Sequence, residues 1–285
     1  MTKPIAFATD NEWPQLTPSD QMAGAALAEL GAHVQAARWD VPQDWAQYRA
    51  VVIRSPWDYH VRPGEYLAWL DELEAAGVEV CNSIAIQRWN MHKGYLAELE
   101  SKGVRIVPSL WLKQGQPIPY ADVQAQGWER AVLKPLVSAD SYKTWIIDDQ
   151  QAWDTHQPEV LVETDGVVQA FMPEVQTIGE HSFIFFDGQF SHCVLKTPKH
   201  GDFRTQAGYG ATARAVEAEP GWIAQAQQAL AAVDQRLAYA RVDGILRNGV
   251  FYLMELELIE PHLFLECSPG SAQQFARALL ACLEG

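Results

Sequence analysis

The sequence predicts a mixed α/β and α+β protein, in which a parallel N-terminal unit precedes two mainly antiparallel units. In the first unit, apolar runs alternate with amphipathic segments that end at glycine, as strands and helices do in a parallel, Rossmann-like sheet. The expected strands are residues 5–8, 33–37, 50–53 and 78–81, and the expected helices are 19–30 and 65–76. Later apolar runs are joined by hairpin turns such as Asp187-Gly188, which is typical of antiparallel sheets. A chain of 285 residues is long enough for two or three separate cores.

The same patterns place the remaining elements and suggest three domains. In the second block we expect a helix at 91–101 and strands at 104–107, 131–134 and 142–147. In the third block we expect strands at 167–171, 181–186 and 189–195, a helix at 222–237, a hairpin from 239 to 258 and a helix at 272–283. The aperiodic segment 196–211 predicts a long loop, and loops of this length often act as functional lids. We therefore place the domains at 1–88, 89–166 and 167–285.

Composition excludes several classes of partner. The formal net charge is −15, with 36 acidic against 21 basic residues, and a field of this sign disfavours nucleic acid and anionic membranes. No apolar run approaches the roughly 20 residues that span a bilayer, and the N-terminus lacks the pattern of a secretory signal. The four cysteines are far apart and form no Cys-x-x-Cys pair, so we expect reduced thiols and a cytoplasmic protein.

Residues 239–258 predict a β-hairpin that carries three acidic side chains. Asn248-Gly249 supplies the turn, because both residues tolerate positive φ angles. Glu255 and Glu257 share one face of the second arm, and Asp243 lies on the first arm. Three carboxylates on one face repel one another unless a cation lies between them, and oxygen ligands favour Mg²⁺. An ordinary hairpin with its acidic residues in water explains the pattern equally well.

The metal interpretation requires a particular register. A strict two-residue loop leaves Asp243 on the opposite face from Glu255. One extra loop residue brings Asp243 opposite Glu255 and Arg241 opposite Glu257, because a shift of one residue moves every side chain to the other face. A metal-binding hairpin therefore predicts a three-residue or bulged loop.

Two lysines upstream are candidates for binding phosphate. Lys134 ends the apolar strand Val132-Leu-Lys-Pro135, so its charge needs an anionic partner, and a nucleotide phosphate would serve. Lys93 lies at the start of an expected helix. For Lys93 alone an ordinary lysine is the better interpretation, whereas for Lys134 a phosphate ligand and a lysine at a domain edge are balanced. The loop 138–144 has small hydroxyl residues that suit a backbone nest over phosphate, although it contains no glycine.

Three further segments carry candidate residues. Gln169-Ala-Phe-Met-Pro173 ends an apolar strand and can present backbone groups to an adenine edge, although a plain core strand is commoner. Arg204 lies in the Gly-flanked loop 201–210, where it either recognises carboxylate or phosphate or is simply solvated. Arg241 shares a face with Asp243 and either neutralises the carboxylates or clamps a phosphoryl group. The sequence shows no persuasive Ser-His-Asp or Cys-His arrangement.

In this order along the chain, these pieces resemble the ATP-grasp superfamily over essentially the whole sequence. The pieces are Lys93, Lys134, the Gln169–Met172 segment, the Asp-Phe-Arg loop and the closing Asp…Glu-x-Glu hairpin. The chain most resembles the cycloserine-forming O-ureido-serine cyclo-ligases and their bacterial relatives. That similarity rests on the segments Val52–Tyr59, Gly179–Ser182, Phe186–His192, Glu255–Pro261 and Pro269–Ala272. The resemblance implies an ATP-grasp fold, in which a Rossmann-like N-terminal domain and two further subdomains enclose ATP.

The resemblance also implies roles for individual positions, with ATP and two Mg²⁺ ions as cofactors. The nucleotide would be bound by Lys93, Lys134, Gln169, Phe171, Met172 and either Glu174 or Glu180. The metal ligands would be Asp243, Glu255 and Glu257, and the catalytic residues would be Arg204 and Arg241. The substrate candidates are Arg54, Ser55, Trp57, Asp58, Tyr59, Ser268 and Gly270, for which packing is an equal explanation. The last metal position is commonly Asn in this superfamily, whereas here it is Glu257.

The function that the resemblance implies is an ADP-forming ligase. It would activate the carboxylate of a small amino-acid-like substrate as an acylphosphate, and a nitrogen nucleophile would then displace phosphate. The alternatives are an ATP-grasp phosphotransferase and an ATP-binding protein without turnover. The expected partners are the small-molecule substrate and, by family, a homodimer, with no nucleic acid and no membrane.

Overall fold

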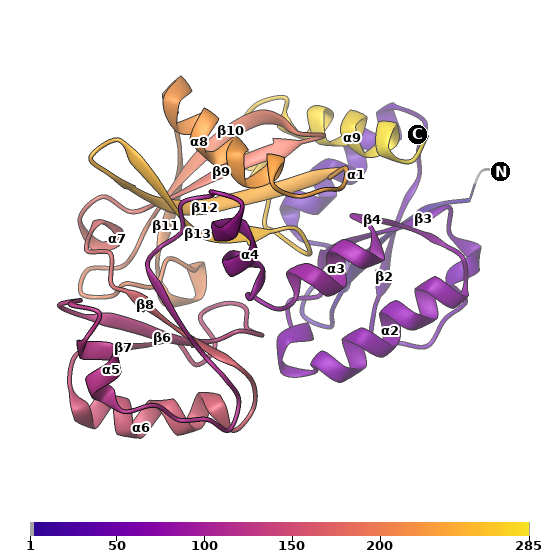
Figure 1. Cartoon of the computed structure of the whole chain (residues 1–285). Helices are drawn as coiled ribbons and strands as arrows, with labels where there is room; N and C mark the ends of the chain where they lie inside the picture. The colour runs from indigo at the N-terminus through magenta and orange to yellow at the C-terminus, as the bar shows by residue number, and fades with distance from the viewer. Residues whose placement is uncertain (1–2, 285) are drawn as a thin grey trace.

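The N-terminal unit is a four-stranded parallel sheet, as predicted. The computed structural model describes residues 3–284 and contains two further sheets (Figure 1). The parallel sheet has the order β2-β1-β3-β4, with β1 at Ile5–Thr9, β2 at Val34–Arg38, β3 at Ala50–Ser55 and β4 at Glu79–Cys81. Helices α1 (Pro18–Glu29) and α2 (Pro63–Ala75) connect its strands. Strands β1 and β3 are buried along their whole length, because helices cover both faces.

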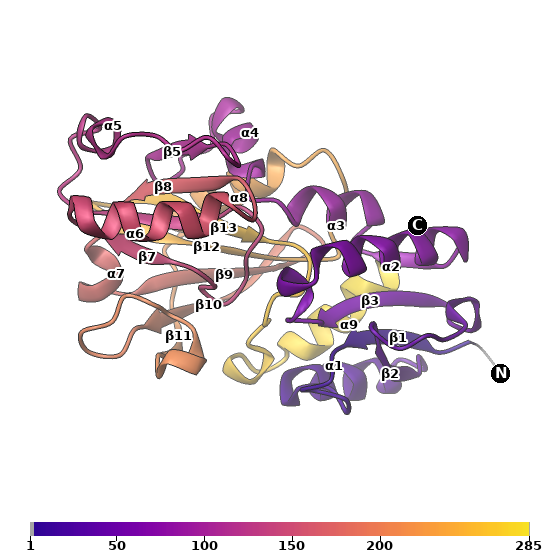
Figure 2. The same cartoon turned by 90° about the horizontal axis from the view of Figure 1, so that it is seen from below.

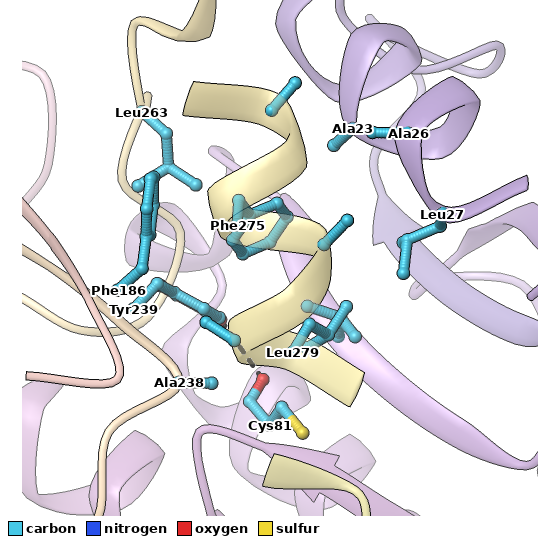
Figure 3. Close-up of a cluster of buried hydrophobic side chains, with 14 of the residues drawn as sticks. Ala23, Ala26, Leu27, Cys81, Phe186, Ala238, Tyr239, Leu263, Phe275 and Leu279 are labelled. Carbon is cyan, nitrogen blue, oxygen red and sulfur yellow. Dashed lines mark hydrogen bonds between the residues drawn. The ribbon is translucent and has the colours of Figure 1, made fainter. Parts of the chain in front are cut away.

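Helix α9 (Ser271–Cys282), which comes from the other end of the chain, completes this unit. Helix α2 packs on one face of the parallel sheet, whereas α1 and α9 share the core on the other face. Figure 3 shows Phe275 and Leu279 of α9 between Leu27 of α1 and Tyr239 of the C-terminal sheet. The Tyr239 hydroxyl is surrounded by the carbonyl oxygens of Ile53, Cys81 and Ile259 at 2.9, 3.1 and 2.9 Å. One core therefore joins the first domain to the last sheet.

The central sheet is antiparallel, with the order β5-β8-β6-β7. Its strands are β5 (Ser109–Leu112), β6 (Ala131–Pro135), β7 (Trp145–Ile147) and β8 (Gly166–Ala170). Helices α5 (Tyr120–Gln124) and α6 (Gln150–Leu161) lie on its outer side (Figure 2). Trp153 of α6 is buried in the core between these helices and the sheet. Within residues 3–284, no helix is long and apolar enough to cross a bilayer.

The C-terminal sheet has five antiparallel strands in the order β11-β10-β9-β12-β13. Its strands are β9 (Glu180–Phe186), β10 (Gln189–Thr197), β11 (Thr212–Val216), β12 (Tyr239–Arg247) and β13 (Val250–Glu257). The helices near it are α3 (Ile84–Asn90), α4 (Tyr95–Ser101), α7 (Glu174–Thr177) and α8 (Pro220–Ala231). Short 3-10 turns lie at Trp45–Gln47, Tyr59–Val61, Ala207–Tyr209 and Leu265–Cys267. Residues of α4 and α8 form one core with a face of this sheet, which leaves its opposite face for the polar side chains described below.

Several predicted elements differ from the structure. The strand predicted at 104–107 is reduced to one bridge between Ile106 and Leu253, and β5 and α6 were not predicted. The helix predicted at 91–101 begins only at Tyr95, so that Lys93 lies in the turn between α3 and α4. The boundary predicted at 166–167 assigns β8 to the third unit, whereas β8 pairs with β5 and β6 in the central sheet. The helix predicted at 222–237 ends at Ala231.

The acidic hairpin has the predicted pairing, but the predicted loop is wrong. Asp243 lies opposite Glu255, and Arg241 lies opposite Glu257. The loop is nevertheless the strict two-residue turn, because Arg247 pairs with Val250 and both turn residues have positive φ. The register shifts inside the strands instead, between Asp243 and Gly244, where Met254 is the extra residue of a β-bulge.

The bulge keeps the acidic side chains out of the core, where the regular alternation of the strand would place them. Phe251 and Leu253 face the core that contains α8, and by alternation Glu255 and Glu257 would follow them into that core. The extra residue changes the phase, so that Leu256 enters the core and the two glutamates turn to the polar face. At Gly244 a Cβ atom would lie 2.3 Å from the Tyr252 carbonyl oxygen, so this position accepts only glycine.

We predict that Gly244→Ala destabilises the protein by at least about 2 kcal/mol in urea unfolding, because the new methyl group collides with backbone across the bulge. The matched control is Gly221→Ala in α8, where a Cβ meets nothing within 4 Å. That variant should be as stable as the parent or slightly more stable. Equal stabilities for the two variants would contradict the account of the bulge.

Candidate active site

Asp243 is the most enclosed carboxylate of the hairpin, with an exposed fraction of 1%. Arg241 donates to both of its oxygens at 3.0 and 3.1 Å, and Lys196 Nζ lies 2.8 Å from Oδ2. Burial would raise the pKa of Asp243, but the charges of Arg241 and Lys196 outweigh it and lower the pKa to about 2. Asp243 is therefore ionised and held by two cations from its own sheet.

Glu255 and Glu257 lie beside it and are more accessible, with side chains 30% and 24% exposed. Glu255 pairs with Lys93 at 2.9 Å, and Glu257 pairs with Arg241. Burial raises the pKa of Glu257 to about 8, and the neighbouring carboxylates act in the same direction. Arg241 lowers this pKa but is shared with Asp243. Glu257 is thus less well compensated than Asp243, which has two cations. Within the described chain, no three acidic, histidine or cysteine side chains are grouped closely enough to hold a metal unaided.

Lys93 is positioned by side chains that bind the exposed edge of β13. Asn90 accepts from the Leu258 N–H at 2.9 Å and donates to the Leu256 carbonyl at 2.8 Å. The Tyr95 hydroxyl accepts from the Leu256 N–H at 3.0 Å. Because Lys93 lies between Asn90 and Tyr95 in the chain, these bonds fix the turn against the strand and direct its ammonium group to Glu255. Sequence analysis did not identify Asn90 or Tyr95.

Lys134 ends β6 on the side of the central sheet that faces this hairpin. Its side chain forms no hydrogen bond or ion pair with any residue between 3 and 284. Burial lowers the pKa of Lys134 to about 8, with the Lys93 charge acting in the same direction and Glu255 and Glu180 opposing it. Lys134 is therefore a partly buried cation without a direct partner, close to three other charged residues.

Lys196 is a third residue that was not predicted, and its ammonium joins Asp243 to Glu180 at 2.8 and 3.2 Å. Its position at the end of the apolar run Cys193-Val-Leu-Lys196 is the same signal that identified Lys134. Glu180, a predicted ribose ligand, is 7% exposed and also accepts from the Thr205 hydroxyl. Thr205 thus anchors the long loop to the sheet. We refer to Lys93, Lys134, Glu180, Lys196, Arg241, Asp243, Glu255 and Glu257 as the charged cluster.

The loop 138–144 has the strained backbone expected of a nest. Asp140, Ser141 and Lys143 have φ angles of 51°, 58° and 47°, which are costly for residues other than glycine and occur mainly at functional sites. The Ser138 carbonyl accepts from Lys93, and the Ser141 hydroxyl donates to Gln206 at 2.7 Å. The loop therefore lies between the charged cluster and the long loop that carries Thr205.

Two predicted residues lie outside the charged cluster. Arg204 forms a bidentate pair with Asp202, at 3.0 and 2.7 Å, and stacks on the Tyr209 ring at 3.7 Å. Its guanidinium is thus used within its own loop. Glu174 forms a bidentate pair with Arg247 at 2.6 and 2.7 Å, which lowers the pKa of Glu174. Of the two glutamates, Glu180 therefore belongs to the charged cluster and Glu174 does not.

The predicted adenine segment connects the central and C-terminal sheets. Gln169 is buried and uses its amide to donate to Ser109 at 3.0 Å, so its side chain holds β8 to β5. The Phe171 ring lies under the Arg130 guanidinium at 4.4 Å and contacts Phe203 of the long loop at 6.4 Å. Met172 packs with Ile245 in a small core. In the described chain the Met172 N–H forms no hydrogen bond, so this backbone donor is available.

The predicted substrate residues at the end of β3 are mainly internal. Arg54 is 1% exposed, pairs with Asp20 at 2.8 Å and donates to the Pro261 carbonyl at 2.8 Å. Ser55 is fully buried and donates to the Thr9 hydroxyl at 2.9 Å. A substrate cannot reach either side chain, so burial argues against the predicted role. Their position at the end of a buried strand was the basis of the prediction. A charged residue at such a position can instead hold two domains together.

The other substrate candidates are divided between the two domains. Asp58 accepts from Trp39 at 2.8 Å, and Tyr59 packs on Tyr66 with ring centres 4.9 Å apart. Trp57 reaches the C-terminal loop, where its indole N–H donates to the Glu260 carbonyl at 3.1 Å. Ser268 and Gly270 belong to the turn before α9 and have no hydrogen bond or ion pair to the charged cluster in the described structure.

Comparison with known proteins identifies proteins that are similar to this chain. The family described as the N-terminal domain of D-cycloserine synthetase DcsG matches residues 5–82. The chain is 27% identical to the cycloserine biosynthesis protein DcsG of Streptomyces lavendulae, over 98% of this chain and 96% of the relative. The crystal structure of D-cycloserine synthetase DcsG matches with a TM-score of 0.89 and 26% identity, covering 98% of this chain and 99% of that one.

Two more distant structures share the fold. D-alanine–D-alanine ligase from Bacillus anthracis, complexed with ATP, has a TM-score of 0.72 and 14% identity, with 99% and 98% of the two chains covered. The ATP-grasp ligase PsnB, complexed with a minimal precursor, has a TM-score of 0.67 and 19% identity, with 99% of each chain covered. The chain has the fold of the ATP-grasp ligases. The predicted fold and the predicted enzyme class, a ligase that forms C–N bonds, are thereby confirmed.

In this ATP-grasp ligase, we predict that Asp20→Asn costs about 3 to 5 kcal/mol of stability, because it leaves Arg54 charged and buried without its carboxylate. Urea unfolding measures the loss. The control is Asp71→Asn, which removes an exposed pair with Arg88 and should cost no more than about 1 kcal/mol. A small effect at Asp20 would show that Arg54 does not depend on this pair.

We also predict that ATP affinity falls by about tenfold between pH 7 and pH 9, because a lysine with a pKa of about 8 loses most of its charge over this interval. The sign follows from the charge, since protonated Lys134 attracts phosphate and neutral lysine does not. Calorimetry with the non-hydrolysed analogue AMPPNP measures the change. Lys134→Arg stays charged throughout and should show a much smaller dependence; an equal dependence in both proteins would assign the effect to another group.

Proposed function

We propose that this ligase uses ATP and Mg²⁺ to join the carboxylate of a small amino-acid-like substrate to a nitrogen nucleophile through an acylphosphate. The observation that carries the proposal is the charged cluster. Four cations from the α3–α4 turn, β6, β10 and β12 gather around carboxylates of the β12–β13 hairpin. A protein with a net charge of −15 has little general attraction for a nucleotide, so a local cation cluster of this kind supports a phosphate site.

The lysines suit the nucleotide phosphates. Lys134 has no partner in the described chain, and Lys93 is already paired with Glu255. Phosphate oxygens that approach Lys134 would form an ion pair with its ammonium group, and Lys93 is close enough to bind the same oxygens. The nest-like loop 138–144 supplies backbone N–H groups above the same region. Adenine would then lie toward Met172, whose N–H is available.

The carboxylates suit Mg²⁺, although three of them do not converge on one point. Mg²⁺ keeps several waters and is usually held by one or two carboxylates together with substrate phosphates. Glu255 and Glu257 are the exposed pair on one face, and they offer the hard oxygen ligands that this ion prefers. We assign them as the protein ligands. Asp243, which Arg241 and Lys196 already neutralise, would orient these cations.

Arg241 suits the transfer step. It is 8% exposed, and its guanidinium is held by Asp243, Glu257 and the His262 carbonyl at 3.0 Å. A fixed, permanently charged donor stabilises negative charge that develops on the phosphoryl group and on the carbonyl oxygen. The protein thus contributes position and charge rather than a covalent group.

The substrate class rests on the relatives. The most similar proteins described above are named as D-cycloserine synthetases, which make a small amino-acid derivative. Similarity of this extent along nearly the whole chain supports a small amino-acid-like acid. It also makes ring closure a reaction to include among those tested.

We predict that the protein releases ADP from Mg-ATP when small amino acids and hydroxylamine are supplied, because hydroxylamine traps an acylphosphate as a hydroxamate. Glu255→Gln should lower this turnover on the order of 100-fold by removing a metal ligand. Binding of ATP without Mg²⁺ should not weaken, since the same change releases Lys93. Coupled ADP detection and product mass measure turnover, and calorimetry measures binding.

The control is Glu217→Gln, an exposed glutamate after β11 that lies outside the cluster. It should leave turnover unchanged. If Glu255→Gln kept full activity, the metal assignment would be wrong. A phosphorylated substrate that accumulates as the final product would identify a phosphotransferase instead, and ATP binding without ADP release across the library would identify a binding protein.

A further inference from the structure

Glu260 is a buried carboxylate that the charged cluster does not explain. It follows β13 and is 9% exposed. Its carbonyl accepts from the Trp57 indole, and the next carbonyl, that of Pro261, accepts from Arg54. Two hydrogen bonds thus fix the backbone of this residue at the point where the end of β3 meets the C-terminal loop.

The side chain of Glu260 has no partner from another residue. Among residues 3–284, its carboxylate accepts a hydrogen bond only from its own backbone N–H, and no cation forms an ion pair with it. The oxygens are not sealed either, because they are absent from the enclosed polar atoms that lack a partner. A residue that is nine-tenths buried therefore keeps acceptor capacity that no other residue satisfies, which is costly unless something binds there.

The cations nearby are engaged elsewhere. Lys93, the cation that most lowers the pKa of Glu260, pairs with Glu255 and donates to the Ser138 carbonyl. Arg241 is held by Asp243 and Glu257. Glu255 and Glu257 are close enough to repel Glu260. The protein thus supplies cations for the phosphates, whereas the carboxylate of Glu260 beside these cations is left without one.

We propose that Glu260 binds the ammonium group of the amino-acid-like substrate and selects substrates that carry one. This inference rests on the proposed function, because it places the substrate amine next to the site where its carboxylate is activated. An ammonium group suits the position better than a second metal ion, since no three metal-ligating side chains gather in the described chain. The aromatic residues Trp57 and Tyr59 lie close to Glu260, and aromatic surroundings favour an organic cation.

The competing explanation is a neutral, protonated carboxyl that only fills space. Burial raises the pKa of Glu260 to about 7, so the neutral form is accessible. Glutamine has the shape and hydrogen-bonding capacity of a protonated glutamic acid. Glu260→Gln therefore preserves the neutral role and removes the charged one, which separates the two explanations.

The experiment measures ADP release with hydroxylamine as the nitrogen nucleophile and two sets of acids. One set is D- and L-alanine and D- and L-serine, and the other is lactate and glycerate, in which hydroxyl replaces the amino group. We expect the parent protein to prefer the amino acids. Glu260→Gln should raise their KM by about tenfold or more, leave the KM of ATP within twofold, and reduce the preference over the hydroxy acids.

The control is Glu266→Gln, an exposed residue of the same C-terminal loop, which should keep both KM values. Unchanged amino-acid KM values in Glu260→Gln, or equal use of amino and hydroxy acids by the parent, would overturn the inference and leave the ligase intact. A change in the KM of ATP equal to that of the acid would assign Glu260 a structural role and also overturn it. No ADP release with any acid would overturn the proposed function itself, and this inference with it.

Discussion

The carboxylates of the β12–β13 hairpin can be buried together only because cations from several elements reach them. Lys93 comes from the turn between two helices, Lys196 from the end of β10, and Arg241 from the hairpin itself. A buried charge that loses its partner costs several kcal/mol, so each of these contacts constrains the element that supplies it. The balance of charge thus also restrains the positions of these elements, and it holds the charged cluster together.

Much of this arrangement could be predicted from the sequence where one segment carries the whole signal. The parallel sheet followed from the alternation of strands and helices, and the pairing of Asp243 with Glu255 followed from the need to place the acids on one face. The position of the bulge was also encoded. Core residues change from Phe251 and Leu253 to Leu256 and Leu258, and this change of phase places the extra residue at Met254 rather than in the turn.

Residues whose role depends on a distant partner were harder to predict. Arg54 appeared to be a ligand at the end of a strand because its partner, Asp20, lies in another element. Arg204 has the expected position in the chain, but its contact with Asp202 decides where its guanidinium points. Glu260 gave no signal, since a carboxylate without a partner can be recognised only when its surroundings are known. The order of motifs along a chain identifies a family, whereas the direction in which each side chain points can be known only from the fold.

Helix α9 has a consequence for how the protein is made. The core between α1 and the parallel sheet includes Phe275, Ala276 and Leu279, which leave the ribosome long after the sheet itself. Until those residues are available, one face of an otherwise complete N-terminal sheet stays open, and its apolar side chains are exposed to other chains. Contacts of such large sequence separation also slow folding. The first domain therefore reaches its native state late in synthesis, and a chaperone that covers α1 and β1 during this interval would favour a good yield.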